Sequence, residues 1–125
     1  METVIYAIGR ILFSAIFVES GFKHITKAKA MGGYAKSMGV PAAEFMTVLT
    51  GIMVLVGGTL VIFNFDTFYG SLLIFLFLVP TAFMMHAFWR VNDDGMKQVQ
   101  RAMFMKNISI AGAALMIMCY TYGVH

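Results

Sequence analysis

The sequence predicts an all-α integral membrane protein, a four-helix bundle with a short interfacial helix between the first and second spans. Of its 125 residues, 60% are hydrophobic and only 12% are charged, whereas about a quarter of the residues in a soluble domain are charged. The mean hydropathy of +0.82 also indicates lipid as the solvent. Since a helix needs about 20 residues to cross a bilayer, we expect four spans, short loops and one domain over residues 1–125.

Four apolar stretches predict the spans, at residues 4–24, 41–63, 68–89 and 107–122. They lack the alternation of polar and apolar residues that is typical of outer-membrane barrel strands. Pro41 suits the first position of the second helix, where its missing N–H group is not needed. Residues 92–95 predict a turn and an N-cap. Met96, Val99 and Met103 follow at helical spacing, so we expect an amphipathic extension ahead of the last span.

Lysine and arginine fall almost entirely in two of the three connections. The first connection and its edge carry Lys23, Lys27, Lys29 and Lys36, and the third carries Arg90, Lys97, Arg101 and Lys106. Basic loops stay on the cytoplasmic side. We therefore expect these connections inside, and both termini outside, a bacterial cytoplasmic (inner) membrane.

The first connection is too long for a simple turn. Ala28, Met31, Ala35 and Met38 follow at spacings of three and four, which places them on one face of a helix. This pattern predicts a short helix lying on the membrane surface. The glycine pair at residues 32–33 weakens such a helix, so a re-entrant turn is the alternative.

Arg10 is the only ionisable residue well inside a predicted span. At 100° per residue it shares a face with Ser14 and Phe17, so we expect it to face the bundle interior. Two interpretations stay open. The side chain snorkels outward toward Asp66 or the tyrosines at the end of the last helix, or it binds an anion or a quinone oxygen.

Polar residues from four helix ends are expected at one level near the cytoplasmic side. They are Lys23, His24, Glu44, His86, Trp89, Lys106 and Asn107. A quinone headgroup at this level needs a proton carrier that titrates near neutral pH and a cationic donor. His86, Glu44 and Lys106 are residues of those types. The alternative is a hydrogen-bond network that only ties the helices together, and the pattern identifies no catalytic residue.

Metal and nucleic-acid binding are disfavoured by the composition. His24 and His86 are two lone histidines on different helices, a weak signal for haem or another metal. The 12 methionines would suit copper, but most lie in apolar spans, where methionine fills cores. We therefore expect no metal site, and residues 84–86 are the one segment whose residue types would suit copper. The basic residues form no stripe that would bind nucleic acid.

Taken together, these residues resemble the DoxX family of small four-helix membrane proteins over nearly the whole length. The resemblance is carried by Arg10, Ser20-Gly21-Phe22-Lys23, Met38-Gly39-Val40-Pro41 with Glu44, Gly57-Gly58, His86-Ala87-Phe88-Trp89 and Phe104-Met105-Lys106-Asn107. The family's polar positions would be Arg10, Lys23, Glu44, His86, Lys106 and Asn107. His24 is not a clear family position, which further disfavours a pair of histidine ligands.

The resemblance implies a fold more firmly than a function. The family is named after a subunit of a thiosulfate–quinone oxidoreductase, and other members resemble partners in membrane redox assemblies. We expect an accessory subunit of a quinone-linked redox complex, in contact with membrane lipid and other membrane subunits. The alternatives are a stand-alone oxidoreductase that interacts with quinone, and a small-solute or anion carrier that uses Arg10. Whether the chain is itself an enzyme stays open.

Overall fold

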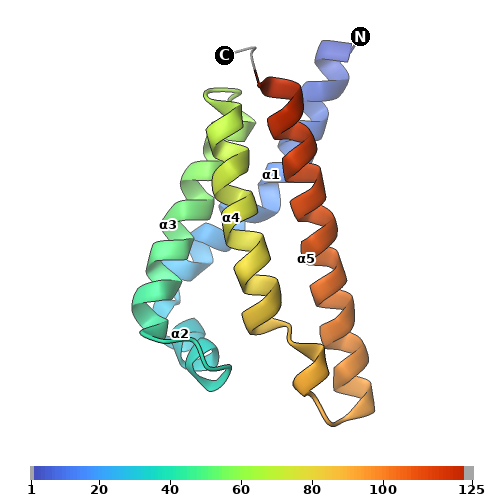
Figure 1. Ribbon diagram of the computed structural model, residues 1–125. Coiled ribbons are helices and arrows are strands. Elements are labelled where there is room, and N and C mark those ends of the chain that lie inside the picture. The colour runs from blue at the N-terminus through green and yellow to red at the C-terminus, as the bar shows by residue number, and fades with distance from the viewer. Residues whose placement is uncertain (1, 123–125) are drawn as a thin grey trace.

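A computed structural model describes residues 2–122 of the chain (Figure 1). Its elements in order are α1 (Glu2–Thr26), α2 (Ala28–Ser37), α3 (Ala43–Ile62), α4 (Thr67–Met85), the 3₁₀ turn η1 (Phe88–Arg90) and α5 (Asp94–Thr121). There is no strand in this part of the chain, so the predicted all-α class is confirmed.

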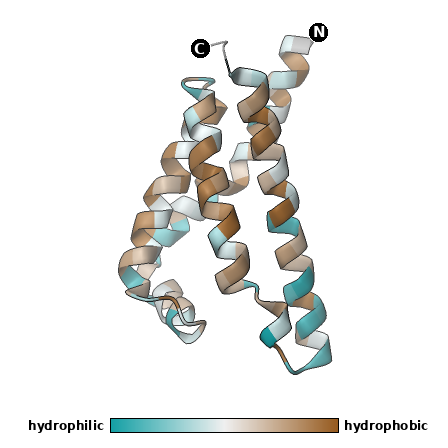
Figure 2. Cartoon of the chain, in the orientation of Figure 1, coloured by the Kyte–Doolittle hydropathy of each residue, from teal (hydrophilic) through white to brown (hydrophobic). Residues whose placement is uncertain are grey.

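Four of these helices are long and apolar enough to cross a membrane: α1, α3, α4 and α5. The predicted integral membrane bundle is therefore confirmed. With 28 residues, α5 is about 42 Å long, longer than the roughly 30 Å hydrocarbon core. Figure 2 shows hydrophilic residues gathered on the first turns of α5, which is the predicted polar extension.

The bundle consists of two helix pairs, α1 with α3 and α4 with α5, joined by contact between α3 and α4. Glycines bring the helices close, because lipid supplies little hydrophobic drive and close backbone packing must replace it. A Cβ atom on Gly21 would lie 2.6 Å from the carbonyl oxygen of Gly51, and one on Gly70 would lie 2.7 Å from that of Gly57. Beyond these contacts the two pairs diverge toward the end where α2 lies (Figure 1).

A small apolar core fills the middle of the bundle. It contains Phe17, Val54, Val61, Ile74, Leu78 and Ala111, all of them buried. Many large apolar side chains outside this core are exposed, including Leu12 and Met116, both 72% exposed. Such a surface suits contact with lipid rather than water.

The connection between α1 and α3 forms the predicted short helix, α2, and its place on the membrane surface remains a prediction. Gly32 is buried in α2, and a Cβ atom there would lie 2.8 Å from the Cα atom of Glu44. The glycine therefore lets α2 pack across the start of α3. Ala35, on the predicted face, is buried as well.

The start of α3 and the end of α4 differ from the predicted bounds, whereas the start of α5 agrees with the prediction. Ala42 has a left-handed backbone conformation (φ 47°), so α3 begins at Ala43 and Pro41 lies in the preceding turn. The third span was expected to continue to Trp89, but α4 ends at Met85 and a short 3₁₀ turn follows. The last helix begins at Asp94, where the Asp93 carboxylate accepts a hydrogen bond from the Met96 N–H group at 2.9 Å. This is the predicted N-cap.

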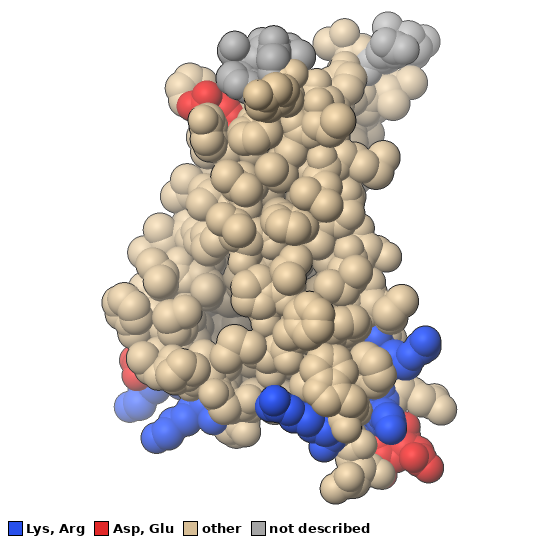
Figure 3. Space-filling model, viewed as in Figure 1, with Lys and Arg blue, Asp and Glu red and all other residues tan. Residues whose placement is uncertain are grey.

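Basic side chains gather at one end of the molecule, on the side where α2 and η1 lie (Figure 3). The start of α1 and the end of α5 lie at the opposite end (Figure 1). This separation is the geometry that the positive-inside rule requires. The assignment of the basic end to the cytoplasm remains a prediction.

Candidate functional site: a cleft at the basic end of the bundle

A cleft of about 710 Å³ opens where the two helix pairs diverge. Pockets of roughly 300–1,000 Å³ hold small molecules and cofactors. Leu49 of α3 and Leu76 of α4 both line the cleft and are both exposed, so it opens sideways between these helices, toward lipid. Figure 3 shows this face hollowed just above the basic residues.

The apolar part of the cleft wall includes aromatic rings and flexible thioethers as well as aliphatic side chains. Phe17 and Phe77 line it together with Met46, Met53 and Met84. Methionine side chains adapt to irregular ligands and make favourable contacts with aromatic rings. These walls therefore suit a flat or flexible apolar molecule.

His24 reaches the cleft from α1 because α1 lies directly on Gly51. A Cβ atom on Gly51 would lie 2.5 Å from the Cβ atom of His24. The Nδ1 atom of His24 lies 3.2 Å from the Thr47 carbonyl oxygen and 3.2 Å from the Thr50 hydroxyl oxygen. Its ring also packs edge-on against Phe77 of α4, so the imidazole is fixed between three helices.

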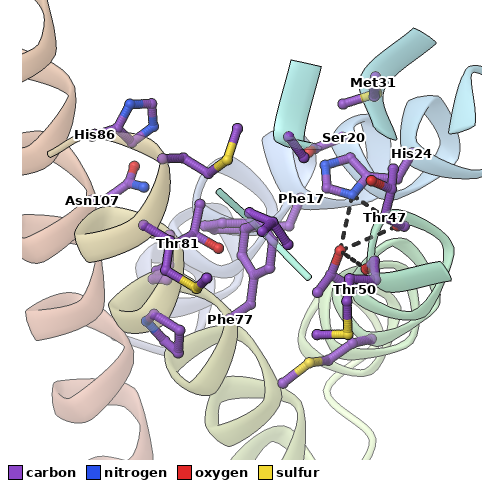
Figure 4. A pocket seen from close by; sticks show the side chains of 18 of the residues that line it. Phe17, Ser20, His24, Met31, Thr47, Thr50, Phe77, Thr81, His86 and Asn107 are labelled. Carbon is purple, nitrogen blue, oxygen red and sulfur yellow. Dashed lines mark hydrogen bonds between the residues drawn. The ribbon is translucent and has the colours of Figure 1, made fainter. Parts of the chain in front are cut away.

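His86 reaches the cleft because α4 ends one residue before it. Its Nδ1 atom lies 2.8 Å from Oε1 of Gln100, a buried residue of α5. This hydrogen bond ties the break after α4 to the neighbouring helix. Figure 4 shows His86 and Asn107 on one side of the cleft and His24 on the other.

Lys106 and Asn107 line the cleft from α5. Asn107 is 7% exposed as a residue, and its side chain makes no hydrogen bond within the described part of the chain. The adjacent Lys106 is exposed and carries a positive charge to the rim. The Asn107 amide is therefore available to hydrogen-bond to a ligand in the cleft.

Three of the predicted inner-layer residues lie outside this cleft. Lys23 is exposed and forms an ion pair with Glu19 one turn earlier on α1, at 2.8 Å. Glu44 is exposed and lines a separate hollow beside α2. Trp89 belongs to an aromatic cluster with Phe83, Phe88 and Phe104, whose ring centroids lie 5.1–6.0 Å apart.

Arg10 lies at the other end of the bundle and does not line the cleft. Its Nη1 atom donates hydrogen bonds to the carbonyl oxygens of Val61 and Ile62, at 3.1 and 2.9 Å. These are among the last carbonyls of α3, which have no partner within the helix and carry its negative dipole end. The guanidinium also lies 5.2 Å from the ring centroid of Tyr6. The side chain therefore caps α3, and the tyrosine that it contacts lies on α1 and is not one of those at the end of the last helix.

The donor set for a metal is limited to the two histidines and neighbouring methionines. No group of three or more His, Cys, Asp or Glu residues clusters among residues 2–122. Met84 and Met85 line the same cleft as His24 and His86. Imidazole and thioether groups suit a soft metal, but these side chains come from walls that face each other across a cavity.

Sequence reasoning missed the partners that hold the two histidines. Gln100 lies seven residues before Asn107, so a helical wheel extended past the predicted start of the last span places both on one face. Thr47 and Thr50 gave no such signal. Threonine is common in membrane helices because its hydroxyl bonds to the carbonyl four residues earlier, as both do here.

Comparison with known proteins agrees with the motifs found in the sequence. The profile of the DoxX family matches residues 5–87, more than half of the chain. The chain belongs to the DoxX family. The resemblance is thereby confirmed, although the matched part of this DoxX protein ends before η1 and α5.

Two relatives in Escherichia coli (strain K12) extend the similarity beyond that match. The DoxX protein is 32% identical to the inner membrane protein YqjF over 117 residues, which cover 94% of this chain and 84% of YqjF. It is 27% identical to the inner membrane protein YphA over 114 residues, which cover 91% of this chain and 81% of YphA. No solved structure matches the chain.

Proposed function

We propose that this DoxX protein binds the ring of a quinone in the cleft and serves as a small accessory subunit of a bacterial membrane redox complex. Quinones are apolar molecules with polar ring oxygens, and they diffuse within the bilayer. The cleft offers matching chemistry: apolar walls, a sideways opening between Leu49 and Leu76, and polar groups at the basic end.

The observation that carries the proposal is the Asn107 amide, which lines the cleft from a buried position on α5 and has no hydrogen-bond partner within residues 2–122. An amide both donates and accepts hydrogen bonds, so it suits a ring oxygen in either redox state. Lys106 adds a cation at the rim, of the kind that stabilises a reduced ring oxygen.

The subunit role rests on the size and composition of the chain. Quinone chemistry requires an electron donor or acceptor, and this chain of 125 residues has a single cysteine and no recognisable cofactor motif. A partner would therefore supply or take the electrons. The names of YqjF and YphA and the basic end of the bundle support a place in the inner membrane, with both termini outside.

The test of the subunit role is extraction in a mild detergent, native electrophoresis and mass spectrometry of each band, with lipid extraction of the same bands. We expect migration with redox subunits and a quinone in the extract. Migration alone with bound quinone would favour a stand-alone quinone-interacting oxidoreductase. Absence of quinone from every band that contains the protein would contradict the cleft assignment.

The carrier alternative receives little support from the position of Arg10. An anion-selective group should face a path through the bundle, whereas Arg10 Nη1 is held by the carbonyl oxygens of Val61 and Ile62. Uptake of an anion into liposomes that Arg10→Met abolishes would revive this alternative.

A further inference from the structure

The two histidines of the cleft have one feature in common: each uses Nδ1 to contact the protein and leaves Nε2 free. Neither Nε2 atom has a hydrogen-bond partner within residues 2–122, and both rings line the cleft. The partners of Nδ1 decide which nitrogen of each neutral ring carries the proton.

For His24, both partners of Nδ1 are hydrogen-bond acceptors. The Thr47 carbonyl oxygen can only accept. The Thr50 hydroxyl has one hydrogen, and it donates this hydrogen to the Met46 carbonyl oxygen at 2.7 Å. Its oxygen can therefore only accept from the ring at 3.2 Å. The Nδ1 atom of His24 carries the proton.

For His86, the partner of Nδ1 is the amide oxygen of Gln100, at 2.8 Å. An amide oxygen accepts and does not donate, so the Nδ1 atom of His86 also carries the proton. In the neutral form, each ring then has a bare lone pair on Nε2. The cleft contains two imidazole acceptors that come from different helices, one on each side (Figure 4).

We propose that this pair of acceptors makes the cleft selective for the reduced, dihydroxy form of the ring over the oxidised quinone. The inference rests on the proposed quinone-binding function. A hydroquinone has two O–H donors that the Nε2 lone pairs accept. A quinone has two carbonyl oxygens, which can only accept hydrogen bonds. Each oxygen would therefore face an Nε2 lone pair, and two acceptors cannot form a hydrogen bond with each other. The Asn107 amide can hydrogen-bond to the hydroquinone and to the quinone, so it does not contribute to the selectivity.

The test compares binding of two matched probes to the purified protein in detergent, a short-chain hydroquinone under anaerobic conditions and the corresponding quinone. The expected result is a dissociation constant at least about tenfold lower for the hydroquinone, since two hydrogen bonds distinguish the probes. His24→Phe and His86→Phe should each reduce this ratio, and the two changes together should bring it close to one.

Gln100→Met is the milder variant if a phenylalanine disturbs folding. It leaves His86 in place but removes the acceptor that fixes its proton, so the ratio should fall while binding of the quinone itself persists. Gln98→Met, an exposed position on the same helix, should leave the ratio unchanged and serves as the matched control.

Two results would overturn the inference, and they differ in what they leave standing. Equal binding of both probes, or tighter binding of the quinone, would contradict the selectivity but keep the cleft as a quinone site. Binding of neither probe would remove the proposed function, and the selectivity with it.

Discussion

The Nδ1 atom of His86 lies 2.8 Å from Oε1 of Gln100, and this hydrogen bond joins the end of α4 to the first part of α5. It lies where the predicted third span is interrupted, between Met85 and the turn η1. Because Gln100 is buried, the contact replaces hydration that both groups have lost. The basic end of the α4–α5 pair therefore depends on a polar contact as well as on apolar packing.

Gln100→Ala should lower the free energy of unfolding by about 1–2 kcal/mol, because it leaves the His86 N–H group without a protein acceptor. The measurement is denaturant unfolding in detergent micelles. Gln98→Ala is the control, since Gln98 is exposed on the same helix and should change stability by less than about 0.5 kcal/mol. Equal effects of the two changes would contradict a stabilising role for the His86–Gln100 bond.

Gly51→Ala should destabilise the α1–α3 pair by about 1–3 kcal/mol, as overpacking does. The added methyl group would lie 2.5 Å from the Cβ atom of His24, so the helices must separate. Gly112→Ala is the matched control, because a Cβ atom there has no neighbour within 4 Å. That change should be neutral or slightly stabilising, since alanine favours helix over glycine. The account of α1–α3 packing fails if both variants unfold at the same denaturant concentration.

Arg10→Met should cost about 1–3 kcal/mol of stability, because two hydrogen bonds from a charged donor to the end of α3 are lost. Binding of a quinone in the cleft should stay within a factor of about two, since Arg10 does not line it. The exposed Arg101 provides the control, with Arg101→Met expected to leave stability unchanged. Loss of quinone binding in a folded Arg10→Met protein would place Arg10 in the binding site instead.

Asn107→Leu should leave the ligand-free protein as stable as before or slightly more stable. The change removes an amide that has no hydrogen-bond partner within residues 2–122 and introduces an apolar side chain of similar size among apolar neighbours of the cleft. Affinity for a short-chain quinone should fall about tenfold, because one hydrogen bond to the ring is lost. Paired measurements of unfolding and of probe binding separate the two effects. Marked destabilisation with unchanged binding would show that Asn107 is a structural residue.

The helices themselves were largely predictable, because apolar length determines where a chain crosses a membrane. The short helix followed from the spacing of Ala28, Met31, Ala35 and Met38, and the structure forms it as α2, with Met38 at its C-cap. The break after Met85 was not predictable. The sequence stays largely apolar through Phe88 and Trp89, and the turn there is accompanied by tertiary contacts, those of these rings with Phe104 and the hydrogen bond between His86 and Gln100.

The sequence predicted the depth at which the candidate site residues lie along the bundle, but not which of their side chains point into the cleft. His24, His86, Lys106 and Asn107 were placed at one end of the bundle, and the structure brings all four to one cleft. Glu44 was placed at the same level but lies beside α2, because Gly32 lets that helix cover the start of α3. Helix length determines depth, whereas the rotation of a side chain toward or away from a cavity depends on how neighbouring helices pack.

The most direct test of the quinone-binding cleft is photoaffinity labelling with a short-chain quinone that carries an azide on its ring, followed by mass spectrometry of the labelled peptides. We predict labels on the cleft walls, within residues 46–53 of α3 and 77–85 of α4, and their loss when unlabelled quinone is added in excess. Labels confined to lipid-facing residues such as Ile8 and Leu12 of α1, and unaffected by competition, would contradict the assignment of the cleft as a quinone site.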